Sequence, residues 1–283
     1  MKGAGRLAVL ILLLAGPAGC APQPLAAARA PRADGRPRVM SLNPCIDAIL
    51  LRVADPDQIL SISHYSHDPR ASSVDVRIAR RYPANFETAE EVVAVRPDVV
   101  LLGPHVAPAT RDRIRSLGIR FVTLTVPSTI SEGLDQVRDV ARAVGFPARG
   151  DALVARIDRA LTLARPPRAS RPIPAIIQQG GGLVPGTGTL ADELLSRTGF
   201  YNMSGTYALK MWDILPLELM VDHPPRVVLT DLAGRRGQDR GLPQGVPGLS
   251  FAHFPERLLQ CSGPNLIEAA GRLARIRAQV AGA

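Results

Sequence analysis

The sequence predicts an α/β protein of two similar lobes, each with a mostly parallel central sheet, joined by one long connecting helix. Strand-like and helix-like patterns alternate along the chain, which is typical of parallel sheets covered by helices. A helix–proline–strand unit occurs twice, at residues 87–103 and, in degenerate form, at residues 217–232. Between the copies, residues 131–163 keep a helical pattern that breaks only at Gly145, Phe146 and Pro147.

Each copy of the repeated unit opens with an acidic residue, Glu90 or Glu218, in a short helical pattern. A proline, Pro97 or Pro224, then stops the helix, because proline lacks an amide hydrogen and clashes with the preceding turn. The runs VVLL and VVLT that follow are apolar enough for central parallel strands. Chance recurrence of this order in any α/β domain stays open as an alternative.

The chain has 283 residues, enough for about two domains, and 46% of them are hydrophobic. Lys2 and Arg6 precede an apolar run at residues 7–15, which is typical of a secretory signal peptide and shorter than the roughly 20 residues that cross a bilayer. The predicted parts are a signal peptide at 1–19, a flexible tether at 20–37, an N-terminal lobe at 38–130, a connecting helical segment at 131–165 and a C-terminal lobe at 166–283.

Cys20 follows small residues and resembles the lipid-acceptor cysteine of bacterial lipoproteins, which predicts a tether to a membrane. Pro17 stands where that motif has a leucine-like residue, so ordinary cleavage after Ala18 is the alternative. The net charge of +9 would suit nucleic acid, but the positive residues are scattered and aromatic residues make up only 4%. We therefore expect no nucleic-acid partner.

The elements of the first lobe follow in order. Asn43 suits a helix cap and Pro44 the first helical turn after the first strand. Later strands end in polar loops, one with His64, Tyr65, His67 and Asp68 and another with His105. The predicted elements are strands at 38–42, 59–63, 99–102 and 119–125, helices at 46–53 and 108–117, and a short helix that opens at Glu90 and stops before Pro97.

The second lobe begins with a strand at 175–178, which leads into a glycine-rich loop at 179–188. A helix at 189–197 and a loop at 201–212 come before the second copy of the repeated unit. A glycine-rich loop at 234–248 and a final helix at 265–280 complete the predicted lobe.

Residues 38–280 resemble the periplasmic solute-binding proteins of ABC importers for cobalamin and iron-siderophores. The segments that show the resemblance are RVMSLNP, SHYSHDP, AEEVVAVRPDVVLL, GTGT before LADELLSRTGFYN, and LELMVDHPPRVVLT. The resemblance implies a periplasmic monomer with a ligand cleft between the lobes, an ABC permease with a cytoplasmic ATPase as partner, no catalysis and no resident cofactor. The ligand would be a corrinoid or a ferric chelate.

Cobalamin-binding members are the most similar, because their aromatic positions correspond to Tyr65, Phe86 and Trp212 here. Ligands of open α/β sheets bind at the carboxyl ends of the strands, and aromatic rings stack on flat macrocycles. Burial of Trp212 and Phe86 in the core is the alternative. The candidate ligand-binding residues are Asn43, His64, Tyr65, Phe86, His105, Gln179, Trp212 and Asp231.

The resemblance also implies that Glu90 and Glu218 dock on arginines of a two-fold symmetric permease. Each glutamate lies near a helix start, where the helix dipole favours a carboxylate, so a purely helix-stabilising role is the alternative. Two equivalent charges on two similar lobes match a symmetric partner.

Two rival chemistries remain. His64, His67 and Asp68 supply ligand types for zinc, manganese or heme iron, although the histidine-rich loop of metal-specific members is missing. Cys45 at a helix start would be a nucleophile with His64 or His67 as base, but no further catalytic motif accompanies it. A disulfide between Cys45 and Cys261 is the structural alternative, which sequence alone does not settle.

Overall fold

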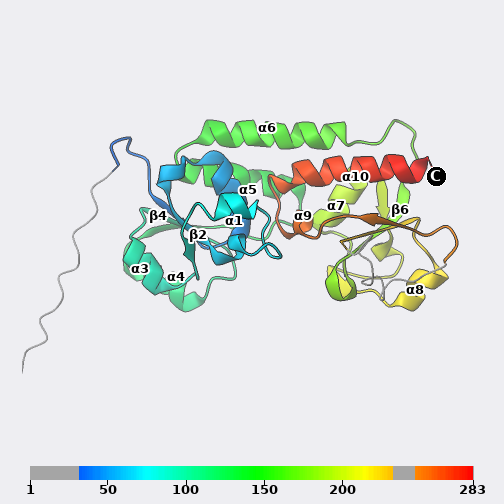
Figure 1. Ribbon diagram of the computed structural model, residues 1–283, viewed down its shortest axis with the longest axis horizontal. Helices are drawn as coiled ribbons and strands as arrows, with labels where there is room; N and C mark the ends of the chain where they lie inside the picture. Colours follow the sequence, from blue (N-terminus) through cyan, green and yellow to red (C-terminus); the bar gives the residue numbers. More distant parts are fainter. Residues whose placement is uncertain (1–31, 232–245, 283) are drawn as a thin grey trace, which may run out of the picture. The chain divides into compact units, whose positions relative to one another are not determined.

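The first lobe is built on a five-stranded parallel sheet of order β3-β2-β1-β4-β5 (Figure 1). The protein is described here by a computed structural model, which covers residues 32–231 and 246–282; the signal peptide and Cys20 lie outside them. The strands are β1 (Val39–Ser41), β2 (Ile59–Ser63), β3 (Ala84–Asn85), β4 (Val99–Leu102) and β5 (Arg120–Thr123). The helices are α1 (Pro44–Val53), η1 (Pro56–Gln58), η2 (His64–His67), α2 (Val76–Ala79), α3 (Ala89–Val95) and α4 (Pro108–Ser116).

The burial of strand β4 on both faces of the sheet explains why its sequence is apolar throughout. All four of its residues are fully buried. Val99 and Leu101 pack in one hydrophobic cluster, whereas Val100 and Leu102 pack in another, because successive side chains of a strand point to opposite faces. Helices therefore cover both faces of this sheet, as the VVLL run predicted.

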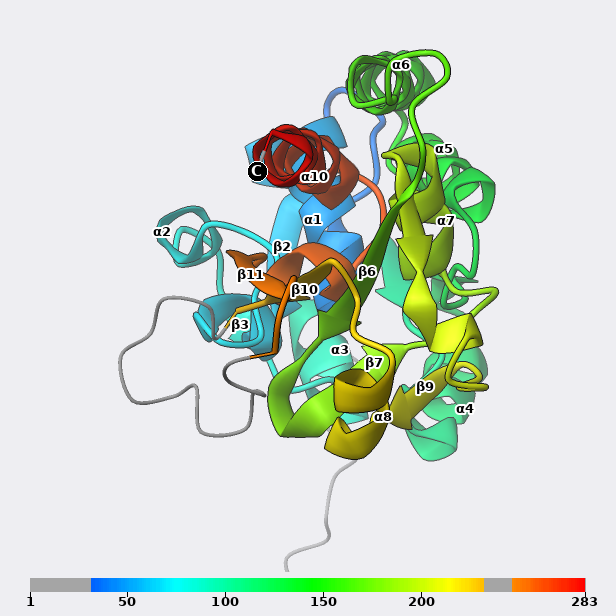
Figure 2. The same ribbon diagram turned by 90° about the vertical axis from the view of Figure 1, so that its right-hand side faces the viewer.

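The second lobe has a four-stranded parallel sheet of order β11-β10-β6-β8 (Figure 2). Its strands are β6 (Ile173–Gln178), β8 (Phe200–Asn202), β10 (Val227–Thr230) and β11 (Ser250–His253). Its helices are η3 (Gly180–Gly182), α7 (Leu190–Arg197), η4 (Met203–Gly205), α8 (Leu217–Asp222), α9 (Arg257–Gln260) and α10 (Asn265–Ala281). An antiparallel pair that was not predicted joins β7 (Leu183–Pro185), which lies inside the predicted loop at 179–188, to β9 (Trp212–Ile214), which begins at the last residue of the predicted loop at 201–212.

The repeated unit takes equivalent places in the two sheets. In the first lobe β4 pairs with the opening strand β1, and in the second lobe β10 pairs with the opening strand β6. On its other side, each opening strand pairs with another parallel strand, β2 or β8. The helices α3 and α8 therefore precede corresponding strands, which supports an internal duplication rather than a chance pattern.

The connecting segment contains two helices, α5 (Ile130–Ala143) and α6 (Pro147–Leu163), which pack along each other. Gly145 takes a left-handed conformation with a φ of 84°, which allows the chain to reverse, and Pro147 begins the second helix. The second helix, α6, which is about 26 Å long at 1.5 Å per residue, carries the chain from one lobe to the other. The segment predicted as one long pattern is thus a helical hairpin whose second arm is the connector.

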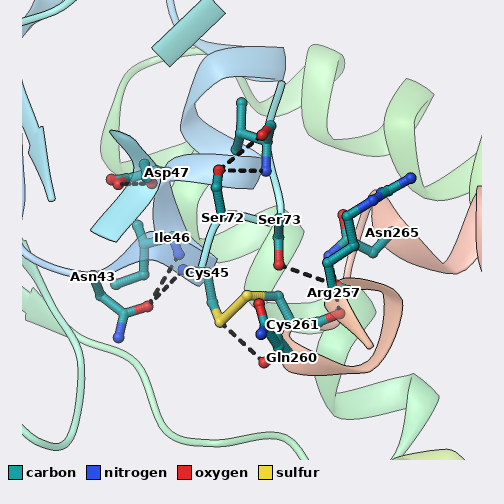
Figure 3. Close-up of a disulfide and its surroundings, with 12 residues drawn as sticks. Asn43, Cys45, Ile46, Asp47, Ser72, Ser73, Arg257, Gln260, Cys261 and Asn265 are labelled. Atoms are coloured by element: carbon teal, nitrogen blue, oxygen red, sulfur yellow. Dashed lines mark hydrogen bonds between the residues drawn. A yellow bond between two sulfur atoms is a disulfide. The ribbon is translucent and has the colours of Figure 1, made fainter. Parts of the chain in front are cut away.

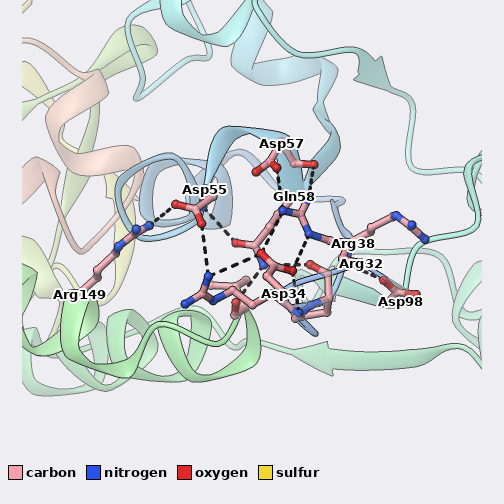
Figure 4. Close-up of polar contacts among 11 residues, drawn as sticks. Arg32, Asp34, Arg38, Asp55, Asp57, Gln58, Asp98 and Arg149 are labelled. Carbon is pink, nitrogen blue, oxygen red and sulfur yellow. Dashed lines mark hydrogen bonds and ion pairs between the residues drawn. The ribbon is translucent and has the colours of Figure 1, made fainter. Parts of the chain in front are cut away.

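Polar contacts fix the turn of this hairpin to the start of the first lobe (Figure 4). Arg149 on α6 pairs with Asp55 at 2.8 Å, and Arg36 pairs with the same carboxylate at 3.8 Å. The two guanidinium groups also lie over the Phe146 ring, 3.6 and 4.1 Å from its centroid. Exposed ion pairs contribute little on their own, so the stacking on Phe146 carries much of this contact.

One hydrophobic cluster reaches from lobe to lobe. It includes Val39 of β1 and Ala175 of β6, and buried residues of α1, α5, α6 and α10 lie between them. The two sheets thus rest on a shared layer of helices, which limits how far the lobes can move apart. In the described part of the chain, no helix combines the length and apolarity needed to span a membrane.

Candidate functional site

A pocket of about 480 Å³ lies between the lobes at the carboxyl ends of the central strands. Its first-lobe wall comes from the start of α1 and from the chain after β4 and β5. Its second-lobe wall comes from the chain after β6, the start of α7, the edge of β9 and the segment after α9. This position agrees with the strand-end rule, and the volume lies within the range of small-molecule sites.

Four of the predicted ligand-binding residues line this pocket: Asn43, His105, Gln179 and Trp212. Asn43 caps α1, because its side-chain oxygen accepts hydrogen bonds from the amides of Cys45 at 2.9 Å and Ile46 at 3.2 Å. Its amide nitrogen lies against Gly103, where an added Cβ would approach it to 2.4 Å. A glycine at the end of β4 is therefore needed to seat this asparagine at the pocket.

Trp212 stands at the edge of the antiparallel pair and remains 42% exposed. Its strand is held by β7, where Trp212 pairs with Pro185, and Gly186 donates a hydrogen bond to the carbonyl of Met211. An added Cβ on Gly186 would lie 2.6 Å from the Met211 amide nitrogen, so only glycine permits this approach. Met211 itself has a φ of 52°, and such strained positions are common at functional sites.

Three other predicted residues, the half-buried His64 and the exposed Tyr65 and Phe86, form a cluster of rings outside the pocket lining. The His64 ring lies 4.0 Å from the Tyr65 ring and 4.7 Å from the Phe86 ring, measured between centroids. Tyr65 is 47% exposed and Phe86 64% exposed, so neither is a core residue. They follow β2 and β3, which lie on the opposite side of β1 from β4 and β5.

Asp231 also lies apart from the pocket lining. It follows β10, and its carboxylate pairs with the Nε2 atom of His253 at 3.0 Å. Arg272 on α10 contacts the other ring nitrogen of His253 at 3.1 Å. The structure therefore divides the predicted ligand-binding set into a pocket group and two outlying groups.

The predicted metal set does not come together. The Nδ1 atom of His64 lies 3.2 Å from the Asn85 carbonyl oxygen, and Asp68 accepts a hydrogen bond from the Arg70 amide. The Nε2 atom of His67 is buried without a partner. Among the residues that the structure describes, no three His, Cys, Asp or Glu side chains are grouped to hold a metal ion. The prediction of a site at His64, His67 and Asp68 is corrected accordingly.

Cys45 and Cys261 form a disulfide, with their Cα atoms 5.0 Å apart (Figure 3). The two residues are 216 positions apart in the sequence. Both line the pocket. Because the sulfur of Cys45 is bonded, this structure holds no thiol there for the alternative of a cysteine nucleophile.

No charged side chain lines the pocket among the described residues. The apolar lining includes Ile46, Ile49, Leu124 and Leu190. The polar lining comprises four amides (Asn43, Gln136, Gln179, Gln260), four hydroxyls (Thr125, Ser128, Thr189, Ser262) and the imidazole of His105. Sequence reasoning missed the residues after β5 and at the start of α7, although both follow strand ends or a glycine-rich loop.

Glu90 and Glu218 are exposed in the first turns of α3 and α8. Three residues further along each helix, and so on the same face, stands an exposed valine: Val93, 39% exposed, and Val221, 50% exposed. Each lobe thus presents an acidic residue beside an apolar one at an equivalent place in the fold.

Residues 39–241 match the family described as periplasmic binding protein, and the chain belongs to that family. It is accordingly the solute-binding component of an ABC importer, which works in the periplasm with a permease and a small-molecule ligand. Proteins of this family are not enzymes.

Solved structures of similar fold include three periplasmic proteins. The heme-binding protein HutB of Vibrio cholerae has a TM-score of 0.69 at 18% identity, covering 85% of this chain and 98% of that one. The heme-binding protein RhuT from Roseiflexus sp. RS-1 has a TM-score of 0.67 at 20% identity, covering 84% of this chain and 98% of that one. The vitamin B12-binding protein BtuF of Vibrio cholerae has a TM-score of 0.67 at 17% identity, covering 88% of this chain and 99% of that one. At these identities the likeness concerns the fold alone, and no curated protein matches by sequence.

Proposed function

We propose that this binding protein captures a cobalamin-type corrinoid and delivers it to its permease. The observation that carries the proposal is the uncharged lining of the pocket among the described residues, in a chain with 34 Lys and Arg residues. A corrin ring is bordered by neutral amide side chains, which the amides of Asn43, Gln136 and Gln179 can match by hydrogen bonds. Heme and many siderophores carry carboxylates, whose burial without arginine partners is costly.

The apolar part of the lining suits the ring itself. Trp212 offers a half-exposed indole face on one side, and Ile46, Ile49 and Leu124 offer aliphatic contact on the other lobe. Aromatic faces supply a large contact area with little loss of side-chain entropy. A flat macrocycle with polar edges is therefore the ligand class that fits both parts of the lining.

The outlying residues extend this site in our proposal. The cluster of His64, Tyr65 and Phe86 lies at the same edge of its sheet as Asn43, and Asp231 lies at the same edge of its sheet as Gln179. Side chains at these positions would contact the periphery of a ligand that is larger than the pocket. Tyr65 and Phe86 are the exposed aromatic members of this outer group.

Heme is the second candidate, because His105 and Met211 line the same pocket. An imidazole and a thioether are both axial ligands of heme iron in proteins. Under this alternative the two heme carboxylates would meet no cationic side chain among the described lining residues.

The test is titration of the purified mature protein with cyanocobalamin, hemin, a ferric siderophore, Zn²⁺ and Mn²⁺. Trp212 is the single tryptophan of the chain, so quenching of its fluorescence reports on the pocket directly. We expect saturable quenching by cyanocobalamin and no turnover of it. Tight binding of hemin or a metal ion without a response to cyanocobalamin would contradict the proposal.

Two further assignments belong to this function. We propose that Glu90 and Glu218 dock on the permease and that Cys20 carries a lipid that tethers the protein to a membrane. With Cys45 and Cys261 bonded and Cys20 lipidated, protein extracted from its native membrane should show no free thiol after denaturation. A free thiol on Cys20 would leave cleavage after Ala18 as the processing route.

A further inference from the structure

The disulfide links the two lobes directly. Cys45 stands in the first turn of α1 in the first lobe, and Cys261 follows α9 in the chain of the second lobe. Along the chain, the lobes are joined through the connector α6. The disulfide is therefore a second covalent connection between them, made at the pocket rather than along the connecting helix.

The segment around Cys261, residues 259–263, is packed into the first lobe. A Cβ added to Gly133 of α5 would lie 1.7 Å from the Ser262 hydroxyl oxygen, so the segment approaches α5 as closely as glycine allows. Gly263 has a φ of 75°, and a Cβ there would lie 3.3 Å from Ile49 of α1. The segment thus occupies a groove between α1 and α5.

Polar contacts to this segment are few and long. The Gln260 side-chain amide donates to the Arg70 carbonyl at 3.4 Å, and the Asn265 side-chain amide donates to the Cys261 carbonyl at 3.4 Å. The Ser262 hydroxyl is buried without a hydrogen-bond partner. Besides close packing, the disulfide is consequently the strongest restraint on the segment.

The same segment forms one wall of the ligand pocket. Its lining residues run from Leu259 to Ser262, and they face Cys45, Ile46 and Ile49 of α1. Any outward movement of the segment from α1 would widen the pocket. The position of this wall therefore depends on whether the disulfide is intact.

We propose that the Cys45–Cys261 disulfide is a positioning element of the ligand site, which holds residues 259–263 against α1 and makes ligand retention sensitive to reduction. The effect of the disulfide on corrinoid retention rests on the function proposed above, whereas its effect on the position of residues 259–263 does not. Reduction proceeds by thiol–disulfide exchange with a dithiol. The dithiol gives up two electrons and two protons and becomes a cyclic disulfide, while the protein gains two thiols.

Hydrogen–deuterium exchange tests the wall without any ligand. The full-length mature protein is compared before and after dithiothreitol, together with the variant Cys45→Ser/Cys261→Ser. We expect amides of residues 259–263 and of the first turn of α1 to exchange about tenfold faster in both proteins that lack the disulfide, with β4 and β10 unchanged. Equal exchange in the oxidised and reduced proteins would overturn the proposal.

Ligand release tests the consequence, with cyanocobalamin as the probe. We expect its dissociation rate to rise about tenfold on reduction, and the double serine variant to show the faster rate with or without dithiothreitol. Ile114→Ala is the stability control, because Ile114 is fully buried in a separate cluster of the first lobe. An equal acceleration in Ile114→Ala would show a general loss of stability and refute positioning. Failure of cyanocobalamin to bind the oxidised protein would refute the corrinoid function, and exchange would still decide the role of the disulfide.

Discussion

The Ser66 hydroxyl donates a hydrogen bond of 2.6 Å to the carboxylate of Asp47, which is fully buried beneath η2. The amide of Ser63 donates to the same oxygen atom at 3.0 Å. These two contacts fix both ends of the turn that carries His64 and Tyr65. The second carboxylate oxygen has no hydrogen-bond partner.

Burial raises the pKa of Asp47 to about 7, although the nearby hydroxyls of Ser41 and Ser66 and the amide of Ser63 oppose this shift. The pKa is thus higher in the folded than in the unfolded protein. The folded state binds the proton more tightly, so the stabilising effect of that proton is complete below pH 3.8 and is lost as pH rises towards 7.

The Asp47→Asn variant should therefore remove a loss of stability of about 2–3 kcal/mol between pH 5 and pH 8, because its side chain stays neutral and keeps one oxygen as acceptor. Urea unfolding at the two pH values measures it. Asp112→Asn, at an exposed carboxylate on α4, is the control and should keep the wild-type dependence on pH. If Asp47→Asn also keeps the wild-type dependence of stability on pH, Asp47 is not the group that causes it.

Trp212→Ala should weaken cyanocobalamin binding about 30-fold, which corresponds to about 2 kcal/mol for the loss of a buried aromatic contact. Calorimetry measures the affinity, since the variant has no tryptophan fluorescence. Tyr201→Ala removes another half-exposed ring of the second lobe that does not line the pocket, and it should bind normally. Unchanged affinity in Trp212→Ala would exclude stacking at this position.

Charge reversal by Glu90→Lys and Glu218→Lys together should abolish delivery to the permease and leave ligand affinity unchanged. Both glutamates lie outside the pocket lining, and charges at the edge of an interface mainly govern encounter and orientation. Transport and ligand-stimulated ATPase activity in vesicles that contain the permease measure the effect.

A matched control for the docking prediction is Asp135→Lys with Asp158→Lys, which makes the same change in net charge on α5 and α6. This control should transport normally. Normal delivery by the glutamate double variant would show that α3 and α8 do not dock. Equal loss in the control would show that overall charge matters rather than these two helices.

The lobes should close only slightly around a ligand. They share one hydrophobic cluster, the helix α6 connects them, and the disulfide crosses between them. X-ray scattering of the free and loaded protein should give nearly equal radii of gyration. A contraction of the kind seen in large hinge closure would contradict this expectation.

Much of the fold could be predicted because its signals are local. The strand β2 has the predicted bounds, and Asn43 and Pro44 begin α1 as expected. The pair β7 and β9 was missed, since neither segment alternates and each is stabilised mainly by the other. Periodicity also failed to show that residues 131–163 reverse at Gly145, because both arms have the same helical pattern.

The sequence by itself determined the two-lobe α/β class, the repeated unit and the family resemblance, because these depend on residues that are close together in the chain. Only the tertiary structure decided the membership of the pocket. Strand order places β1 between β2 and β4, so His105 reaches the pocket with Asn43, whereas Tyr65 lies on the other side. Cys45 meets Cys261 because residues 259–263 fit against a glycine of α5, and that contact joins positions 216 residues apart.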